Sequence, residues 1–555
     1  MSTGETVGSQ VASPAPAVVT RPSAGQRLVY VIVCGGVLMA AVDLTIVNVA
    51  LPSVGRALGG GLSNLSWVLN GYAIVYAALL IPAGRLADRG SRRAAFLAGV
   101  GIFVTGSALC AGAVSLPMLV AARVVQAAGA ATLMPTSLSL MLASYGSEGR
   151  ARAVRSWAAI AGIGAAIGPF LGGLLVTIDW RWIFLVNVPV GVVVVLAGRR
   201  SLPEARTAAR GALPDIPGAV VLILAVSALS LVLVEGTSWG WASWRILLAA
   251  AVTVVALAAF VRRCARHPSP VISPGLMRLP GFLIANLAGL LYSASFAAAI
   301  LSVSLWCQDV WGWSALITGL AMAPGNVLLP FVSAWSGTVA QRLGVVGTIA
   351  AGCCLLAGGT SWWILAVGER PDYLVALLPG VLLTRIGIGL ALPSLVGAAT
   401  IGLPPADLAT GSAINNMLRQ LGFSLGYSLF ILFAGHYAAG HALPAFRSGW
   451  EFAAIAALLA AGAGATLVSR PGTRPPGSRP AAVRRSRDRA LRADGDLGPV
   501  RVEGDVPGDL RHRGVGVLVA PDEVGLRAAV RGGDAVVAGV ALVGAVGLGG
   551  GPLEQ

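Results

Sequence analysis

The chain has 555 residues, of which 56% are hydrophobic and 11% charged, and its mean hydropathy is +0.80. Soluble domains usually carry about 25% charged residues, so this composition argues against a soluble enzyme, a secreted disulfide scaffold and a disordered protein. The formal net charge of +16 does not indicate nucleic-acid binding, because the basic residues lie in short gaps between apolar runs. The sequence therefore predicts an all-α polytopic membrane protein.

Fourteen apolar stretches approach the roughly 20-residue length that spans the hydrocarbon of a bilayer. Residues 1–27 before them predict a disordered cytoplasmic arm rather than a signal peptide, and residues 469–555 after them predict a cytoplasmic, largely disordered tail. In that tail Ala535–Gly549 is an alternative fifteenth span, although it is short. The predicted spans are Leu28–Leu51, Ser66–Ala83, Ala94–Ala113, Pro117–Leu142, Ser156–Thr177, Trp182–Gly198, Ile216–Val234, Ile246–Val261, Phe282–Leu305, Ser314–Trp335, Val345–Val367, Tyr373–Ile401, Asp407–Ala434 and Gly449–Val468.

The placement of arginine tests this topology independently. With the N-terminus inside, the even-numbered gaps between spans hold sixteen arginines and the odd-numbered gaps hold five. Cytoplasmic loops carry such an excess, so both termini are predicted to lie on the cytoplasmic side of the cell membrane. The five arginines of the outer gaps are Arg56, Arg181, Arg245, Arg370 and Arg447.

Two parts of the chain repeat each other. The loop Gly84–Arg93 after the second span has a degraded copy, Gly337–Gly344, after the tenth, and Arg123 in the fourth span is matched by Arg385 in the twelfth. Removing the seventh and eighth spans brings both pairs into register, which predicts two related bundles around a midplane substrate site. The predicted domains are a six-helix bundle over 28–198, linkers with two inserted helices over 199–281, and a second six-helix bundle over 282–468.

Five motifs then occur in order along the chain: Asp43–Pro52, Gly84–Arg93, Arg123–Gln126, Gly164–Gly173 and Trp180–Gly191. In this order they resemble the major facilitator superfamily, and specifically its fourteen-helix drug:proton antiporter branch. The resemblance covers about Leu28 to Val468. It implies a major facilitator fold of two six-helix bundles plus two inserted helices, and secondary transport of drugs or antibiotics.

Asp43 lies in the middle of an apolar span, where a carboxylate costs about 2.5–3.5 kcal/mol on insertion scales. We predict that it faces a cavity, exchanges a proton and attracts cations; the alternative is a structural pair with a neighbouring helix, for example with Arg123. Arg123 and Gln126 lie three residues apart on one helical face and are predicted to point into the same cavity. The resemblance implies that Arg123 assists proton transfer, and the alternative is that it braces the fold.

The loop after the second span resembles the superfamily's cytoplasmic gate. The resemblance implies that Asp88 pairs with arginines or caps a helix of the other bundle, and we expect its partner near Asp407–Gly411. The plain alternative is a positive-inside anchor. The predicted gate residues are Gly84, Asp88, Arg89, Arg92 and Arg93.

The fifth span carries small residues every four positions, a spacing that lets two helices touch closely, and a proline that bends the axis. The resemblance implies an antiporter signature that seals the pocket against proton leak; mere packing is the alternative. These residues are Gly164, Gly168, Pro169, Gly172 and Gly173. Polar residues that would be costly in lipid are expected to line the cavity: Asn48, Asn286, Asn415, Arg419 and Gln420.

The function predicted from these features is proton-coupled export of amphipathic or cationic drugs by alternating access. Because the sequence contains no lysine, it has no phosphate loop ending in Gly-Lys-Ser/Thr, so a proton gradient rather than ATP is the expected energy source. The expected partners are a small-molecule substrate, protons and lipid. We expect a monomer with no cofactor, no metal and no nucleic acid. The alternatives are proton-linked uptake, a non-transporting sensor with the tail as its output, and an intramembrane enzyme; the four histidines form no His-Glu-x-x-His pair.

Overall fold

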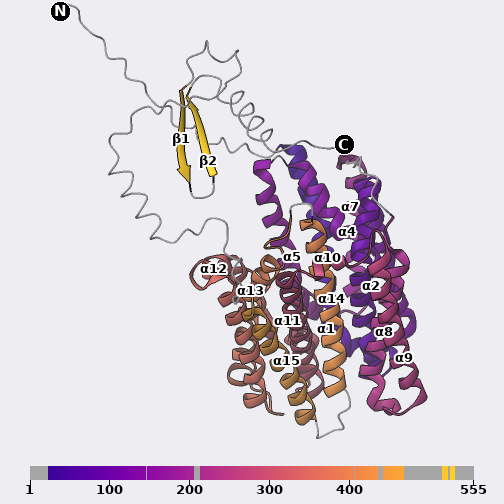
Figure 1. The fold of residues 1–555 in the computed structure, drawn as a ribbon. Helices are drawn as coiled ribbons and strands as arrows, with labels where there is room; N and C mark the ends of the chain where they lie inside the picture. Colours follow the sequence, from indigo (N-terminus) through magenta and orange to yellow (C-terminus); the bar gives the residue numbers. More distant parts are fainter. Residues whose placement is uncertain are drawn as a thin grey trace, which may run out of the picture. The chain divides into compact units, whose positions relative to one another are not determined.

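The fourteen predicted spans correspond to α-helices in the computed structural model of the chain (Figure 1). The structure describes residues 23–145, 147–204, 213–404, 407–434, 442–467, 516–522 and 525–531. Most of the predicted N-terminal arm, much of the predicted tail and the alternative span Ala535–Gly549 lie outside the described residues. Thirteen helices within those ranges are long and apolar enough to cross a membrane.

The N-terminal bundle contains six membrane spans. The first begins at a capping box, in which the Ser23 hydroxyl accepts a hydrogen bond from the Gln26 amide and the Gln26 side chain accepts one from the Ser23 amide. The sixth span comprises two helices, α6 and α7, that follow each other directly. The helices are α1 (Ala24–Leu58), α2 (Leu62–Arg89), α3 (Arg92–Ala111), α4 (Leu116–Ser144), α5 (Ser147–Val176), α6 (Trp182–Leu185) and α7 (Asn187–Ser201).

The remaining membrane helices form the inserted pair and the C-terminal bundle. The inserted pair is α8 (Ile216–Trp239) and α9 (Trp244–Arg266), and the short α10 (Pro274–Met277) leads from it into the second bundle. The C-terminal bundle contains α11 (Pro280–Leu305), the π-helix η1 (Trp306–Val310), α12 (Ala315–Ala366), the π-helix η2 (Tyr373–Leu377), α13 (Leu378–Ala398), α14 (Leu408–Ala434) and α15 (Ala442–Ala465).

Helix α12 contains two membrane spans. Its 52 residues would extend about 78 Å as one straight helix, far more than the roughly 30 Å of bilayer hydrocarbon. Gly344 interrupts it with φ 75° and ψ 163°, a backbone conformation that glycine adopts readily. The chain turns back there, so residues 315–343 and 345–366 cross separately, and the described residues contain fourteen spans as predicted.

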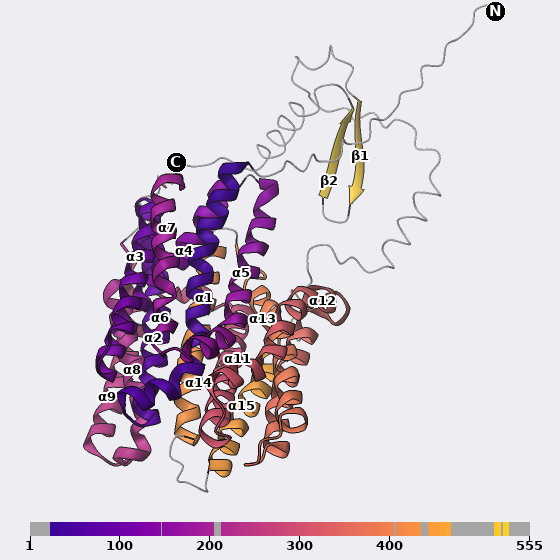
Figure 2. The ribbon, with the colours of Figure 1, turned by 180° about the vertical axis from the view of Figure 1, so that it is seen from behind.

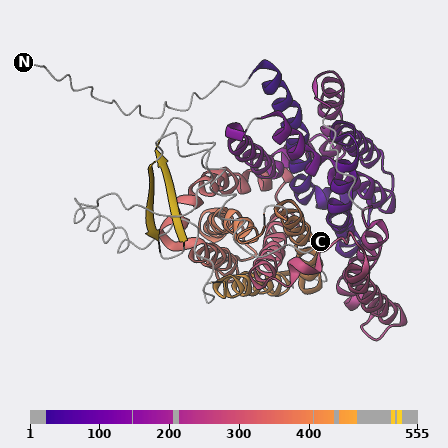
Figure 3. The same cartoon turned by 45° about the horizontal axis from the view of Figure 1, so that its top comes forward.

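Two helix bundles lie side by side in the membrane part of the chain (Figures 2 and 3). Helix α8 packs against both α2 and α14, whereas α9 packs against α8 and exposes apolar side chains such as Val254 and Val255. The inserted pair therefore lies outside the twelve helices of the two bundles, and its α8 covers the line where α2 meets α14.

Corresponding helix pairs in the two bundles pack through glycines at the same spacing. Gly99 and Gly106 of α3 lie against the backbone of α4, and Gly352 and Gly359 of α12 lie against the backbone of α13. Each pair is seven residues apart, so both glycines fall on one helical face. This shared contact supports the internal duplication inferred from the loop motifs.

A separate unit, residues 474–555, contains a two-stranded antiparallel sheet. Strand β1 (Gly516–Asp522) pairs with β2 (Gly525–Arg531), with Gly516 opposite Arg531. The hairpin differs from the largely disordered tail predicted above, because that prediction rested on the overall proline, arginine and glycine content of the tail.

Candidate functional site

Asp43 is the centre of a buried polar network within the N-terminal bundle. Its Oδ2 accepts a hydrogen bond of 2.6 Å from Arg123 Nη1, and its Oδ1 accepts one of 2.8 Å from Gln126 Nε2. Asn187 Nδ2 of α7 donates a third, 3.2 Å long, to the same Oδ1. One guanidinium and two side-chain amides thus take the place of water around this buried carboxylate.

Arg123 is equally enclosed. Besides Asp43 it donates to Gln126 Oε1 at 2.7 Å and to the backbone oxygen of Val68 at 3.3 Å, and its guanidinium lies 4.1 Å from the centre of the Tyr72 ring. The exposed fractions of Asp43 and Arg123 are 0% and 1%. Cation–π contact and hydrogen bonds together replace the water that the charged group lost.

The prediction that Asp43 faces a cavity does not describe this structure. The side chains around the carboxylate come from α3, α4 and α7, all in the N-terminal bundle. The alternative stated from the sequence, a pair with Arg123, is the arrangement observed. The physical reason is that the carboxylate is satisfied within its own bundle, where Arg123 and two amides reach it together.

Two further residues of this network were missed from the sequence. Ser107 of α3 accepts hydrogen bonds from Gln126 at 2.6 Å and from Asn187 at 3.2 Å, and Asn187 also bonds Asp43 directly. Asn187 could have been found, because it is a polar residue within an apolar stretch of the Trp180–Gly191 motif. Ser107 carries no such signal, since single serines are common in membrane helices.

The glycines of the fifth span hold α5 against both bundles. A side chain at Gly164 or Gly168 would collide with α1, at Ala41 and Thr45 respectively. A side chain at Gly173 would collide with the α12 backbone at Ala315, and Gly319 of α12 faces the backbone oxygen of Pro169 in return. Gly172 likewise faces Ile46 of α1. The predicted close helix contact is therefore present, and it joins α5 to the second bundle.

Hydrogen bonds close the two bundles against each other toward the predicted outer face. Ser304 Oγ donates to the Asn48 backbone oxygen at 2.8 Å, and Gln308 Nε2 donates to the Val49 backbone oxygen at 2.9 Å. Asn70 of α2 bonds Ser428 and Ser424 of α14, each at 3.1 Å. These groups are buried, so the outer half of the interface is sealed.

The predicted cytoplasmic gate is placed differently from expectation. Asp88, in the last turn of α2, pairs with Arg92, the first residue of α3, at 2.9 Å, and the Asp88 side chain is 53% exposed. Within the described residues Asp88 has no hydrogen bond or ion pair to the start of α14, where 407–411 were its expected partner. Ser91 caps α3 between the two charges, so the loop satisfies Asp88 locally. Gly84 packs on Pro135 of α4, which fits a close-approach role.

The other gate arginines lie at the same end of the bundle. Arg93 donates a hydrogen bond to the backbone oxygen of Arg199, at the end of α7. Arg85 donates to Ser269 Oγ at 2.7 Å and to the Pro270 backbone oxygen at 2.8 Å, which ties the loop to the segment after the inserted helices. Arg89, also predicted for the gate, is the last residue of α2 and has an interaction of its own there.

The expected cavity residues of the C-terminal bundle come together in part. Asn415 of α14 donates to Asn286 Oδ1 of α11 at 3.1 Å, and Arg419 lies beside the same α11 helix at Gly289. Gln420 is buried nearby on α14. Asn48 belongs to the outer seal instead, since its backbone oxygen accepts from Ser304.

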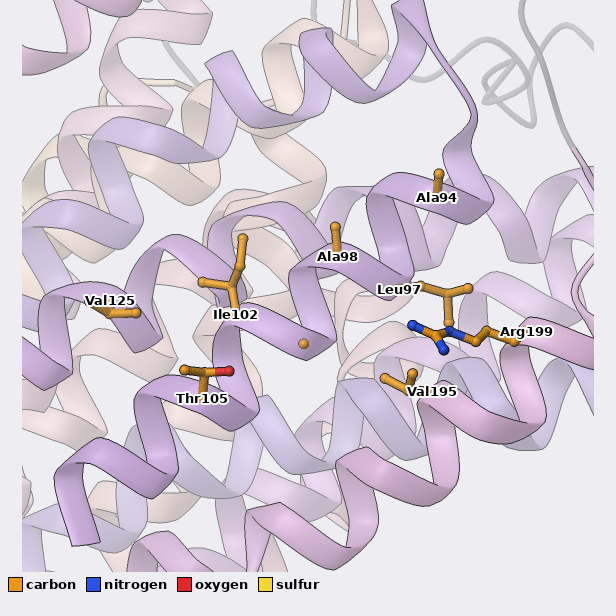
Figure 4. A pocket seen from close by; sticks show the side chains of 9 residues that line it. Ala94, Leu97, Ala98, Ile102, Thr105, Val125, Val195 and Arg199 are labelled. Atoms are coloured by element: carbon orange, nitrogen blue, oxygen red, sulfur yellow. The ribbon is translucent and has the colours of Figure 1, made fainter. Parts of the chain in front are cut away.

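A groove of about 550 Å³ lies on the side of the N-terminal bundle, between α3, α4 and α7 (Figure 4). Its walls are apolar except for Thr105 and Arg199, and Arg199 lies beside Leu97 and Val195. No residue of the Asp43 network lines it.

The family model described as the Major Facilitator Superfamily matches residues 33–427. The chain belongs to this superfamily. It is therefore a transporter and a multi-pass protein of the cell membrane, in a superfamily of transporters rather than enzymes.

Characterised relatives within the superfamily are resistance and export proteins. A methylenomycin A resistance protein of Streptomyces coelicolor is 33% identical over 77% of this chain and 89% of its own length. The cephamycin export protein CmcT of Amycolatopsis lactamdurans is 34% identical over 74% of this chain and 85% of its own. The multidrug resistance protein Stp of Mycobacterium tuberculosis is 33% identical over 71% and 73%. The chain thus groups with the antibiotic and multidrug exporters of the superfamily.

Solved structures share the superfamily's fold at low sequence identity. The peptide transporter PepTSo of the POT family has a TM-score of 0.58 and 17% identity, over 81% of this chain and 100% of its own. An auto-inhibited POT family peptide transporter has a TM-score of 0.57 and 16% identity, over 82% and 99%. At these identities the likeness concerns the fold alone.

Proposed function

We propose that this protein exports amphipathic antibiotics or drugs in exchange for protons, by alternating access between its two bundles. The observation that carries the proposal is the Asp43–Arg123–Gln126 network, a buried carboxylate held by a permanent cation at the centre of the membrane. An intramembrane ionisable pair is costly, so its presence indicates a functional role. The names of the relatives support the substrate class.

The chemistry of the exchange follows from the pair. While Asp43 is ionised it holds Arg123, and a proton added to Oδ1 or Oδ2 removes the charge that attracts the guanidinium. Arg123 is then held by Gln126, the Val68 backbone oxygen and the Tyr72 ring alone, so it can shift its position. A proton that crosses a membrane potential contributes about 2.3 kcal/mol per 100 mV, which can drive export against a gradient.

Aromatic rings link this pair to the interface between bundles. The Tyr72 ring, which contacts Arg123, is stacked on Tyr76 one turn away, with centroids 6.0 Å apart and planes 11° apart. Tyr76 in turn faces Asn416 and Arg419 of α14. A shift of Arg123 would therefore reach the second bundle through two packed rings.

The sequence predicts cationic substrates on the assumption that the Asp43 carboxylate is available to pair with them. Asp43 is already neutralised by Arg123, so a cationic compound would have to displace that arginine. We therefore expect amphipathic substrates first, and positively charged ones only where they can displace Arg123.

The test compares drug susceptibility of cells that carry the wild type, Asp43→Asn or an empty vector, and then transport by purified protein in liposomes. We expect resistance over the vector with the wild type, and loss of pH-gradient-driven flux with Asp43→Asn. Equal flux in both proteins, with the same dependence on the pH gradient, would remove Asp43 from the mechanism. Accumulation in energised cells distinguishes export from proton-linked uptake, and resistance that survives deletion of residues 474–555 distinguishes transport from a sensor that signals through that unit.

A further inference from the structure

The C-terminal bundle contains one buried and one partly buried arginine that have no acidic partner among the described residues. Arg385 of α13 is 4% exposed, and Arg419 of α14 is partly buried with its Nε enclosed. Within the described part of the chain, neither one forms an ion pair with an aspartate or glutamate. Two cations near the midplane are thus left without a counter-ion.

Arg123 in the other bundle shows how fully a buried arginine can be paired in this protein. It donates to a carboxylate, an amide oxygen and a backbone carbonyl. Arg385 donates from Nε to Asn326 Oδ1 at 2.8 Å, and Arg419 Nε has no hydrogen-bond partner. A guanidinium carries five N–H donors in a planar fork, so both retain donors for a further ligand.

The surroundings of the two arginines are shaped to hold them. Gly325 of α12 leaves space for the Arg385 side chain, since a side chain there would approach Arg385 Cγ to 2.7 Å. Next to it, Asn326 is 5% exposed and its Nδ2 has no hydrogen-bond partner. An amide donor that is buried without an acceptor points to a missing acceptor at this place.

Aromatic rings connect the two positions. The Arg385 guanidinium lies 5.5 Å from the centre of the Phe296 ring, and Phe296 contacts Phe423 at 5.4 Å between centroids. Phe423 is one helical turn beyond Arg419. The Tyr292 hydroxyl donates a hydrogen bond of 3.4 Å to the Ile388 backbone oxygen, about one helical turn beyond Arg385. The Arg419 side chain lies beside Gly289, about one turn before Tyr292 on α11. The cations are therefore bordered by apolar rings, which suit a ligand with an apolar or aromatic body.

All of these residues lie near the middle of the membrane. Arg419 is 11 residues into α14 and Tyr292 is 12 residues into α11, which places each about 17 Å from the predicted cytoplasmic end of its helix. Helix α14, which carries Arg419, packs against α2 of the N-terminal bundle, so the cluster borders the interface between bundles. Substrate sites of such two-bundle transporters lie at this depth.

We infer that Arg385 and Arg419 form an anion-recognition site that binds the carboxylate of an amphipathic organic acid, with Asn326 as an additional donor. The inference rests on the proposed function and specifies its substrate class: the exported compounds carry an acidic group. A guanidinium binds a carboxylate through two parallel N–H···O bonds, and the rings of Phe296 and Tyr292 would pack on the apolar part of the bound molecule.

The experiment measures binding by purified full-length protein, as the rise in unfolding temperature on adding ligand, with tryptophan fluorescence as the signal. The probes are two matched pairs: fusidic acid with its methyl ester, and 1-naphthylacetic acid with 1-naphthylacetamide. We expect both acids to stabilise the wild type, with apparent affinities at least tenfold higher than those of their neutral partners. Inorganic phosphate is a further probe, expected to give no shift.

Variants then assign the effect to the two arginines. Arg385→Gln and Arg419→Gln are each expected to weaken binding of the acids at least tenfold, whereas Arg342→Gln, at an exposed arginine of α12, should leave it unchanged. Arg385→Lys and Arg419→Lys keep the positive charge but lose the planar guanidinium that binds a carboxylate with two hydrogen bonds. These variants test the site if a glutamine variant fails to fold. They are expected to fold and to bind the acids severalfold more weakly than the wild type.

Three results would overturn the inference: no stabilisation by either acid, equal stabilisation by acid and neutral partner, or undiminished acid binding in the arginine variants. A shift with phosphate equal to that with the acids would reduce the site to a simple anion site and also overturn it. Because binding needs no proton gradient, its outcome is independent of the transport test. Arginine-dependent binding of acids without proton-driven flux would contradict the proposed function alone.

Discussion

A single carboxylate shows how closely two roles can be combined at one position. Asp43 is bonded by Arg123, Gln126 and Asn187, so it contributes to the fold of its bundle whatever it does in transport. Breaking a buried pair by removing one partner usually costs about 3–5 kcal/mol, whereas replacing both partners by neutral groups is often neutral. Stability and transport can therefore be separated by mutation.

We predict that Asp43→Asn lowers the unfolding temperature, because Arg123 remains buried with its charge uncompensated. The double variant Asp43→Asn with Arg123→Gln should recover most of that stability, since no charge is left in the network. The same double variant should still lack proton-driven transport. The measurements are unfolding in detergent and flux in liposomes. A double variant that transports with wild-type pH dependence would make the pair purely structural.

At the level of residues, the sequence identified the charged members of the site and missed their geometry. Asp43, Arg123 and Gln126 stand out because polar side chains are rare in apolar spans. Which way they point could not be read from one helix, because the direction depends on Asn187 and Ser107 on two other helices. The Asp88 partner was wrong for a similar reason: Arg92, four residues away, reaches it first.

Among the elements, α5 is the helix whose sequence most directly determines its packing. Its glycines occur every four residues and meet α1 on one side and α12 on the other. The spacing predicted a close contact, and the structure identifies the two partner helices. The two apolar runs of α12 are each long enough for one span, so the sequence predicts a gap between them over residues 336–344. The structure narrows that gap to Gly344, because the helix continues up to residue 343.

We predict that Gly168→Ala impairs the protein more than Gly162→Ala in the same helix. A methyl group at 168 collides with Thr45 of α1, whereas at 162 no atom lies within 4 Å. Overpacking of this kind costs about 1–3 kcal/mol, and the separation of α5 from α1 should also let protons leak. The unfolding temperature and the proton leak of liposomes without substrate measure the two effects. Equal unfolding temperatures and equal proton leaks in the two alanine variants would show that the glycines of α5 do not seal the protein against protons.

On the scale of the whole molecule, the structure is closed toward the predicted outer face. Gln308 and Ser304 bond backbone oxygens of α1, and Asn70 joins two serines of α14. The sequence predicted two bundles and their inserted pair but could not predict which face is closed. That difference depends on contacts between residues more than 250 positions apart, such as Gln308 with Val49.

We predict that Gln308→Ala opens the outer face more often, because it removes the bond to Val49 from the seal. Cys307, buried beside it, reports the opening when Cys354, the exposed cysteine, is replaced by serine. Alkylation of Cys307 by a membrane-impermeant maleimide should be several-fold faster than in the parent, while Gln341→Ala, at an exposed position, leaves the rate unchanged. An unaltered rate in Gln308→Ala would mean that this bond does not control the opening.

Helix α8 touches both bundles at once, and its Ser230 hydroxyl lies 3.5 Å from Ser424 of α14, within the polar group around Asn70. If the two bundles rock against each other, α14 must slide along α8, and the Ser230–Ser424 contact must break and re-form. A serine pair with interchangeable donors can exchange partners as it moves, at little energetic cost. The inserted helix α8 would then keep lipid away from the line where α2 meets α14 while the bundles move.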